Sequence, residues 1–470
     1  MLFNTPEFFI FFAIVLALYF MMTRRWQNIL LIVASYVFYG WWDSRFCVLL
    51  LISTILDFVC GLMIPGKRPK LWLWISVVGQ LGMLCFFKYF NFFESSVIDL
   101  CHLFGMNPSW PTLKLVLPVG ISFYTFQTLS YTIDIYRKKL EPTRNFAEFA
   151  VFVSFFPHLV AGPILRATYM LPQIMKDRHV GAREISEGAY FILVGLVKKV
   201  AIADMIAPLV KSAAENPGAM SSLQLLLSSY MFALQIYCDF SGYTDCARGI
   251  SRLLGFHLPE NFNWPYFSAG FQEFWRRWHM SLSFWLRDYL YFSLGGSRCS
   301  TLKTYRNLFI TMLLGGLWHG ASWNFVLWGG LHGIYLALGR MSGPLFWNAL
   351  KEKAQQWKIG WLLTGLCILF TFHVVNFTWI FFFIPDFSVA AKYFDGLLAF
   401  TTTCDPDRIR LFIYALIVIL FIDLPEFLFG SHEWLINRPR PLRALFYAIF
   451  VILLMITWTD NYEPFIYFQF

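Results

Sequence analysis

The chain has 470 residues, of which 58% are hydrophobic, 20% are aromatic and only 14% are charged. Soluble domains carry about 25% charged residues, so this chain cannot cover a water-exposed surface of its own size. The composition excludes a disordered chain, a coiled coil, a disulfide-rich secreted scaffold and a nucleic-acid-binding protein as main interpretations. It predicts a membrane protein that crosses the bilayer many times.

Apolar runs follow one another along the chain, and many approach the roughly 20 residues that a helix needs to cross a bilayer. We therefore expect an all-α, polytopic membrane protein with about eleven transmembrane helices. The runs lie near residues 7–23, 27–43, 45–64, 71–90, 115–135, 186–210, 222–240, 306–318, 323–340, 360–384, 409–429 and 442–459.

Basic clusters follow the first, third and fifth of these runs: Arg24-Arg25, Lys67–Lys70 and Arg137–Lys139. Cytoplasmic loops carry an excess of Lys and Arg, and an N-terminus outside the cytoplasm puts all three clusters on the cytoplasmic side. We expect the first run to be a transmembrane helix and not a signal peptide, because its basic residues follow it instead of preceding it. We expect a multi-pass protein of the cytoplasmic (inner) membrane with an extracytoplasmic N-terminus.

Two stretches in the middle of the chain differ from simple spans. Residues 146–175 are apolar but contain three prolines, and such broken backbone is tolerated at membrane depth only where protein buries it or where it lines a cavity. Residues 241–300 are too polar to cross as one lipid-facing helix and too aromatic for a free loop. Both stretches predict re-entrant or interfacial helices.

The densest polar region runs from Tyr237 to Arg298. Asp239 and Asp245 stand six residues apart near its start. Two carboxylates at this spacing suit acid–base work or a cation site, but a membrane helix end with ion pairs is the safer interpretation.

A mixture of tryptophan, arginine and histidine follows in the string Phe274–Ser283, which contains Arg276, Arg277, Trp278 and His279. Residue types alone favour an amphipathic helix at the membrane surface. The arginines could equally hold an anionic ligand such as a phosphate, because a guanidinium group pairs with it through two hydrogen bonds.

Two further histidines stand among small and aromatic residues: His319 in the string Gly315–Asn324 and His332 in the string Trp328–Gly333. A neutral imidazole suits general-base catalysis on a hydroxyl, and burial would keep it neutral. A histidine hydrogen-bonded inside a helix bundle is an equal alternative for His319 and the favoured one for His332. The nine cysteines form no C-x-x-C pair, so we expect neither a metal site nor a disulfide framework.

Several of these strings, in this order, resemble motifs of the membrane-bound O-acyltransferases: Asp239–Asp245, Pro259–Tyr266, Phe274–Ser283, Trp318–Gly320 and Trp328–Gly333. They are most similar to the bacterial branch of alginate O-acetylases, peptidoglycan O-acetyltransferases and D-alanyl transferases of teichoic acids. The resemblance implies one membrane domain, residues 1–470, with helices in a ring around a central tunnel. Within it we expect N-terminal helices (1–140), a catalytic core (141–340) and C-terminal helices (341–470).

The resemblance also implies an activity, which is the transfer of acetyl groups from a cytoplasmic donor to an extracytoplasmic polysaccharide such as an alginate-like exopolysaccharide or peptidoglycan. The donor would be acetyl-CoA or an acyl-carrier thioester, with no permanently bound cofactor. Beyond membrane lipids and the polysaccharide, the expected partner is a periplasmic SGNH-type acetyltransferase. Transfer would be direct or would pass through that partner.

Individual residues receive roles from the same resemblance. His319 is expected to be the catalytic histidine and His279 a second functional histidine, with His332 as a secondary candidate. The residues expected to bind donor or substrate are Arg276, Arg277, Trp278, Trp318, Asn324, Asp239 and Asp245.

Two alternatives stay open. One is D-alanyl transfer to teichoic acid. The other is a transporter or flippase of an acyl or polysaccharide intermediate, in which the histidines form a proton relay. Broken polar segments also suit transporters, but no inverted repeat is visible in the sequence.

Overall fold

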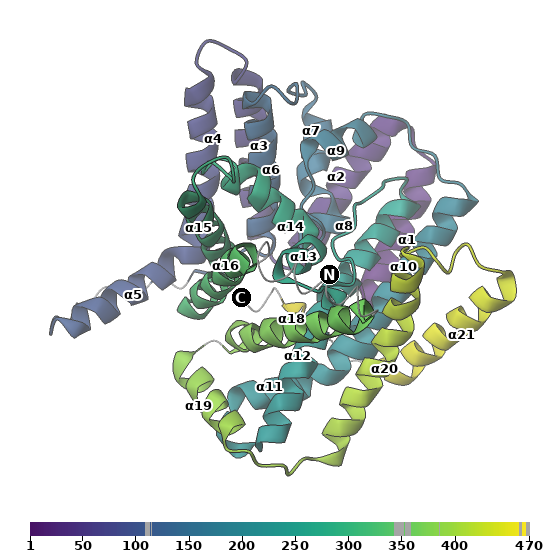
Figure 1. Cartoon of the computed structure of the whole chain (residues 1–470). Helices are drawn as coiled ribbons and strands as arrows, with labels where there is room; N and C mark the ends of the chain where they lie inside the picture. Colours follow the sequence, from purple (N-terminus) through teal and green to yellow (C-terminus); the bar gives the residue numbers. More distant parts are fainter. Residues whose placement is uncertain are drawn as a thin grey trace. The chain divides into compact units, whose positions relative to one another are not determined.

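The computed structural model describes residues 1–108, 113, 115–342, 352, 359–384, 386–459 and 463–466 (Figure 1). Every regular element among these residues is a helix, which confirms the all-α prediction. The chain forms two compact units, one of residues 1–188 with 247–258 and one of residues 189–246 with 259–470.

The first unit is built mainly from the N-terminal helices. They are α1 (Pro6–Phe20), α2 (Arg24–Gly40), α3 (Arg45–Met63), α4 (Pro69–Leu84), η1 (Cys85–Tyr89), α5 (Phe90–Leu103), α6 (Ile121–Tyr136), α7 (Phe146–Ser154), α8 (Phe156–Leu159), α9 (Ala167–Ile174) and the start of α10 (Ala182–Leu196). Helix α6 packs against both α3 and α4, and α7 packs against α2.

Polar side chains join the helices of this first unit inside its core. Asp57 is fully buried and accepts a hydrogen bond from Gln80 Nε2 at 3.0 Å, while Ser53 donates to Gln80 Oε1 at 2.9 Å. Hydrogen bonds of this kind hold helices together in a membrane. Asp57, which stands inside an apolar run, therefore has structural partners.

Two predicted boundaries of the first unit can be compared with the structure. The run near 71–90 continues as one helical stretch through η1 and α5 and ends only before Gly105, whose φ of +74° suits the residue after a helix end. The stretch 146–175 is broken into the three short helices α7, α8 and α9, and so it is not a simple span.

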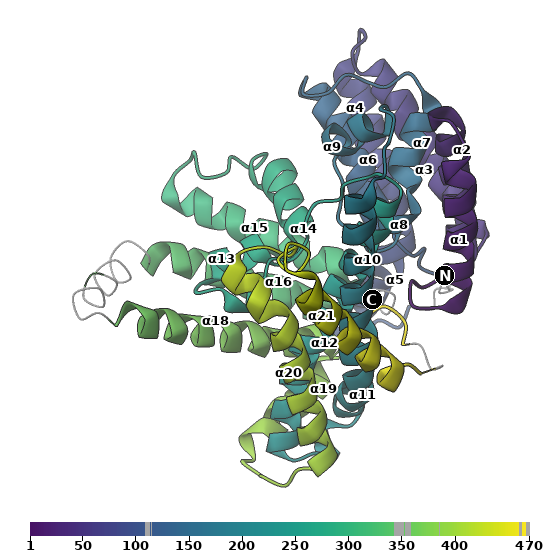
Figure 2. The same ribbon diagram turned by 90° about the vertical axis from the view of Figure 1, so that its right-hand side faces the viewer.

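The second unit contains the remaining helices. They are the end of α10, η2 (Val197–Asp204), α11 (Met205–Glu215), η3 (Pro217–Ala219), most of α12 (Ser222–Leu253), η4 (Pro265–Phe267), α13 (Phe271–Arg277), α14 (Met280–Trp285), η5 (Leu286–Tyr291), α15 (Thr301–His319), α16 (Trp323–Ser342), α18 (Gly360–Phe383), α19 (Phe387–Leu398), α20 (Pro406–Phe429) and α21 (Arg440–Thr457). Helices α15 and α16 lie side by side (Figures 1 and 2).

Five helical stretches among the described residues are long and apolar enough to cross a membrane: Arg45–Met63, Pro69–Leu103, Gly360–Phe383, Pro406–Phe429 and Arg440–Thr457. Most other predicted runs are helical too, but their helices are shorter or more polar than these five stretches. Helix α12 runs to Leu253, well beyond the predicted end at residue 240, and lysines of η2 pair with its buried carboxylates Asp239 and Asp245.

Candidate active site

His319 is the last residue of α15, and the packing of α15 against α16 fixes its place in the second unit. A Cβ atom on Gly316 would lie 2.2 Å from the carbonyl oxygen of Phe325 and 2.9 Å from the Cα of Gly329, so only glycine allows the helices to approach this closely. The His319 side chain is buried. Its ring centroid lies 5.1 Å from that of Trp328 on α16.

His279 joins α13 to α14 and has a left-handed backbone, with φ at +40°. Its side chain is buried, and Nδ1 accepts a hydrogen bond from the Leu282 N–H at 3.4 Å. The neutral ring therefore carries its hydrogen on Nε2. His279 lies outside the five candidate spans, and its burial lowers the pKa of its imidazole, so the ring is neutral at pH 7.

The two histidines lie together, with their ring centroids 6.4 Å apart. The rings that enclose them, here called the aromatic shell, are those of Phe240, Phe262, Trp318, Trp328 and Phe382. The ring of Trp318 contacts both histidines, with its centroid 5.9 Å from that of His279 and 5.0 Å from that of His319. Such a shell excludes water and strengthens electrostatic interactions inside it.

His332 is buried next to the shell, and hydrogen bonds occupy both of its ring nitrogens. Trp275 Nε1–H donates to Nδ1 at 3.3 Å, so Nε2 carries the hydrogen and donates to Thr378 Oγ1 at 3.0 Å. The ring also contacts Trp328, with centroids 4.7 Å apart. This arrangement fits the interpretation of His332 as a hydrogen-bonded histidine of the helix bundle.

The two predicted arginines have different surroundings. Arg276 is exposed. The Nη2 of Arg277 lies 2.7 Å from a carboxylate oxygen of Glu273, and its Nη1 donates to the carbonyl oxygen of Asn263 at 3.5 Å. Arg277 thus contacts the loop before η4.

Trp278 and Asn324 are both buried close to the shell. The ring of Trp278 meets that of Phe262 edge-on at 5.0 Å and stacks on that of Phe274 at 5.6 Å. The side-chain amide of Asn324, at the start of α16, donates to the carbonyl oxygen of Ile384.

Asp239 and Asp245 meet two buried lysines that our sequence interpretation did not single out. Lys199 Nζ lies 2.8 Å from carboxylate oxygens of both Asp239 and Asp204, and Lys198 Nζ lies 2.9 Å from Asp245. These ion pairs tie η2 to α12. The sequence did contain a signal for these pairs, namely two adjacent lysines inside the apolar run 186–210. A charge at membrane depth is costly unless it is paired, so the two lysines indicate buried acidic partners.

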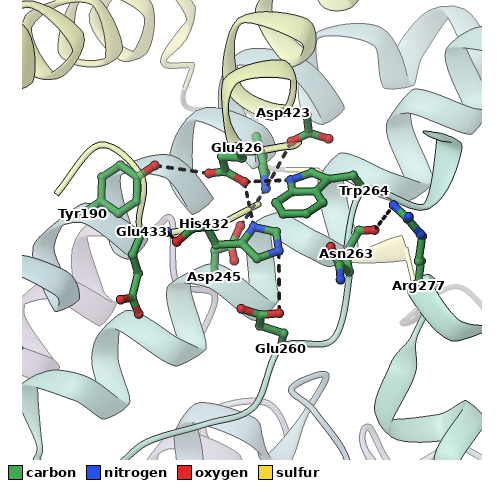
Figure 3. A network of polar contacts seen from close by, with 12 residues as sticks. Tyr190, Asp245, Glu260, Asn263, Trp264, Arg277, Asp423, Glu426, His432 and Glu433 are labelled. Carbon is green, nitrogen blue, oxygen red and sulfur yellow. Dashed lines mark hydrogen bonds and ion pairs between the residues drawn. The ribbon is translucent and has the colours of Figure 1, made fainter. Parts of the chain in front are cut away.

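A second buried polar cluster, also missed, centres on Glu426 of α20 (Figure 3). Its carboxylate accepts hydrogen bonds from Tyr190 Oη at 3.2 Å, Trp264 Nε1 at 3.1 Å and His432 Nδ1 at 2.7 Å. His432 stacks on Trp264 at 4.5 Å and lies 3.9 Å from Glu260. Its loop position alone gave no sign of this burial.

Comparison with known proteins identifies the family. The sequence model of the membrane-bound O-acyltransferase family matches residues 137–382, which is more than half of the chain and includes His279 and His319. The chain belongs to the membrane-bound O-acyltransferase family. The match confirms the family that the sequence motifs resemble and the prediction that the protein is an O-acyltransferase. The family and the apolar helices together show that it is a multi-pass membrane protein.

Curated relatives of this O-acyltransferase cover most of its length. A probable alginate O-acetylase of Pseudomonas aeruginosa is 42% identical over 414 residues, which are 86% of this chain and 76% of the relative. A peptidoglycan O-acetyltransferase of Helicobacter pylori is 34% identical over 440 residues, 85% of this chain and 80% of the relative. A teichoic acid D-alanyltransferase of Streptococcus thermophilus is 31% identical over 240 residues, only 48% of this chain and 58% of the relative.

Among the residues that the structure describes, no group of three or more His, Cys, Asp or Glu side chains is arranged to hold a metal ion. An acyltransferase needs a base for the accepting hydroxyl and a donor for the developing oxyanion, and neutral imidazoles can supply both.

Proposed function

We propose that this acyltransferase moves acetyl groups from a cytoplasmic thioester, acetyl-CoA or an acyl carrier, to hydroxyls of an extracellular polysaccharide. The observation that carries the proposal is the pair of buried histidines, His279 and His319, inside the aromatic shell. The similarity to an alginate O-acetylase and to a peptidoglycan O-acetyltransferase supports acetyl as the group and a polysaccharide as the acceptor.

His319 acts as the general base in the proposed reaction. It takes the proton of the accepting hydroxyl while the oxygen attacks the thioester carbonyl. The new C–O bond forms, the C–S bond breaks, and the proton passes to the leaving thiolate. A positioned base typically contributes about 10²–10⁴ in rate.

His279 is proposed to act on the carbonyl oxygen of the donor. Its hydrogen-bonded Nδ1 puts the hydrogen on Nε2, and this N–H can donate to the oxyanion as it forms. Removing one such donor costs about 10²–10³ in rate in other acyl-transfer enzymes.

Arg276 and Arg277 are proposed to lie on the donor side, where an exposed guanidinium suits the phosphates of coenzyme A or of a carrier. Trp278, Trp318 and Asn324 are proposed to shape the donor site. Asp239 and Asp245 remain candidates for the same site, although their ion pairs also support a role in holding η2 and α12 in place.

The enzyme is proposed to reside in the cytoplasmic membrane with its N-terminus outside. The basic clusters that follow the first, third and fifth apolar runs support this orientation. A periplasmic SGNH-type acetyltransferase is the proposed partner that completes the transfer where the acceptor lies beyond the membrane surface.

The test uses a deletion strain that is complemented with the wild type, His319→Ala, His279→Ala or His373→Ala. His373 is the matched control, because it is exposed on α18. Mild alkali releases ester-linked groups from the exopolysaccharide and the wall, and mass spectrometry identifies them. We expect acetate from the wild type and His373→Ala only, at equal membrane abundance. D-alanine in place of acetate would favour the teichoic acid alternative, and full acetylation by His319→Ala would refute the assignment of the base.

A further inference from the structure

Among the residues that the structure describes, His279 is one of the few other than glycine with a left-handed backbone, and Trp264 is another. Their φ angles are +40° and +46°. L-residues with a side chain avoid this conformation because of steric crowding. It persists only where the surroundings impose it, and such positions cluster at functional sites. Contacts that hold His279 in this state therefore bear on its function.

One residue, Asn261, binds both positions that follow His279. The Asn261 carbonyl oxygen accepts the Met280 N–H at 2.8 Å. The Asn261 Oδ1 accepts both the backbone N–H and the hydroxyl of Ser281, at 3.1 Å and 2.8 Å. Asn261 is 1% exposed, so no bulk water competes for these groups.

The loop that carries Asn261 is itself anchored on the other side of His279. The backbone N–H of Asn263 donates to the carbonyl oxygen of Arg277 at 2.9 Å. Trp264 Nε1 then donates to Glu426 in the cluster of Figure 3. The loop is thus hydrogen-bonded to Arg277, two residues before His279, and to Met280 and Ser281, the two residues after it.

We propose that Asn261 is a positioning residue for His279. Its Oδ1, acting through Ser281, keeps the backbone of His279 left-handed and the imidazole at its place 6.4 Å from His319. Without that acceptor, the turn between α13 and α14 relaxes toward the right-handed region, and the ring leaves the site. The inference rests on the proposed role of His279 in acyl transfer.

The experiment measures thioester consumption and ester formation by purified protein in detergent, with acetyl-CoA as the donor, and separates kcat from KM. Asn261→Ala is expected to lower kcat by about 10–100-fold while KM for acetyl-CoA stays within about twofold, because donor binding uses other side chains. Asn261→Asp keeps an oxygen acceptor for Ser281 and is expected to recover most of kcat.

The matched control is Asn263→Ala, which changes the same residue type in the same loop. The Asn263 side-chain oxygen has no hydrogen-bond partner among the described residues, and alanine keeps the backbone bonds to Arg277. This variant is expected to keep kcat within about twofold of the wild type.

Ser281→Ala provides a second test, since it removes only the hydroxyl donor and leaves Asn261 intact. We expect a several-fold loss of kcat, and no further loss when Ser281→Ala is added to Asn261→Ala. Wild-type kcat in Asn261→Ala, or additive losses in the double variant, would overturn the inference. Normal kcat in His279→Ala would instead refute the proposed role of His279, so the two failures can be told apart.

Discussion

Replacing Lys198 by Met removes the cation that lies between two buried carboxylates of the second unit. Its Nζ lies 2.9 Å from Asp245 and 3.9 Å from Asp423, and its side chain is only 3% exposed. At an effective dielectric constant of about 20, a charge pair about 3–4 Å apart attracts by about 4–6 kcal/mol. Desolvation offsets part of this attraction in the wild type. The variant retains that desolvation for two carboxylates that have lost their lysine, so we expect a loss of about 3–5 kcal/mol.

The loss is measured as the melting temperature of detergent-purified protein. At about 2–4 °C per kcal/mol, Lys198→Met is expected to melt roughly 6–20 °C below the wild type. Lys211→Met is the matched control, because Lys211 pairs with Glu215 at 4.0 Å where both side chains are about two-thirds exposed. Surface pairs of this kind contribute less than about 1 kcal/mol. Equal melting temperatures for the two variants would refute the reasoning about the buried ion pairs.

Two further predictions concern the elements around the histidines. In Gly316→Ala the new methyl group would lie 2.2 Å from the Phe325 carbonyl oxygen, so α16 must move away from α15. We expect the rate of acyl transfer by purified protein to fall more than tenfold. An unchanged rate would show that the close approach of the two helices does not position His319. Glu426→Ala leaves the buried donors of Tyr190 and Trp264 without their acceptor, at a cost of about 1–3 kcal/mol for each. A thermal-shift assay should show a clear drop in melting temperature, and a wild-type value would contradict the role of this cluster.

The sequence predicted the all-α fold and the family, but several element boundaries differ. Polarity near residue 240 predicted a helix end, whereas α12 continues to Leu253 because Lys198 and Lys199 satisfy its carboxylates from η2. The partners lie more than 35 residues apart in the chain, so no local pattern reveals the pairing. The prolines of 146–175 act locally, and there the predicted break agrees with the structure.

For the candidate site, the sequence predicted the two histidines but not the contacts that hold them in place. Local strings and the family resemblance singled out His279 and His319, and the structure brings their rings together. The left-handed backbone of His279 and its hold by Asn261 were beyond prediction, because they depend on hydrogen bonds between segments about 20 residues apart. The partners of His432 depend on tertiary packing in the same way.

The central claim is that His319 is the base of a thioester-dependent acyl transfer. The most direct measurement is the single-turnover transfer of labelled acetyl from acetyl-CoA by purified wild type and His319→Ala, with His373→Ala as control. The account predicts that His319→Ala loses about 10²–10⁴ in rate while His373→Ala matches the wild type. A His319→Ala enzyme that transfers acetyl at the wild-type rate would contradict it.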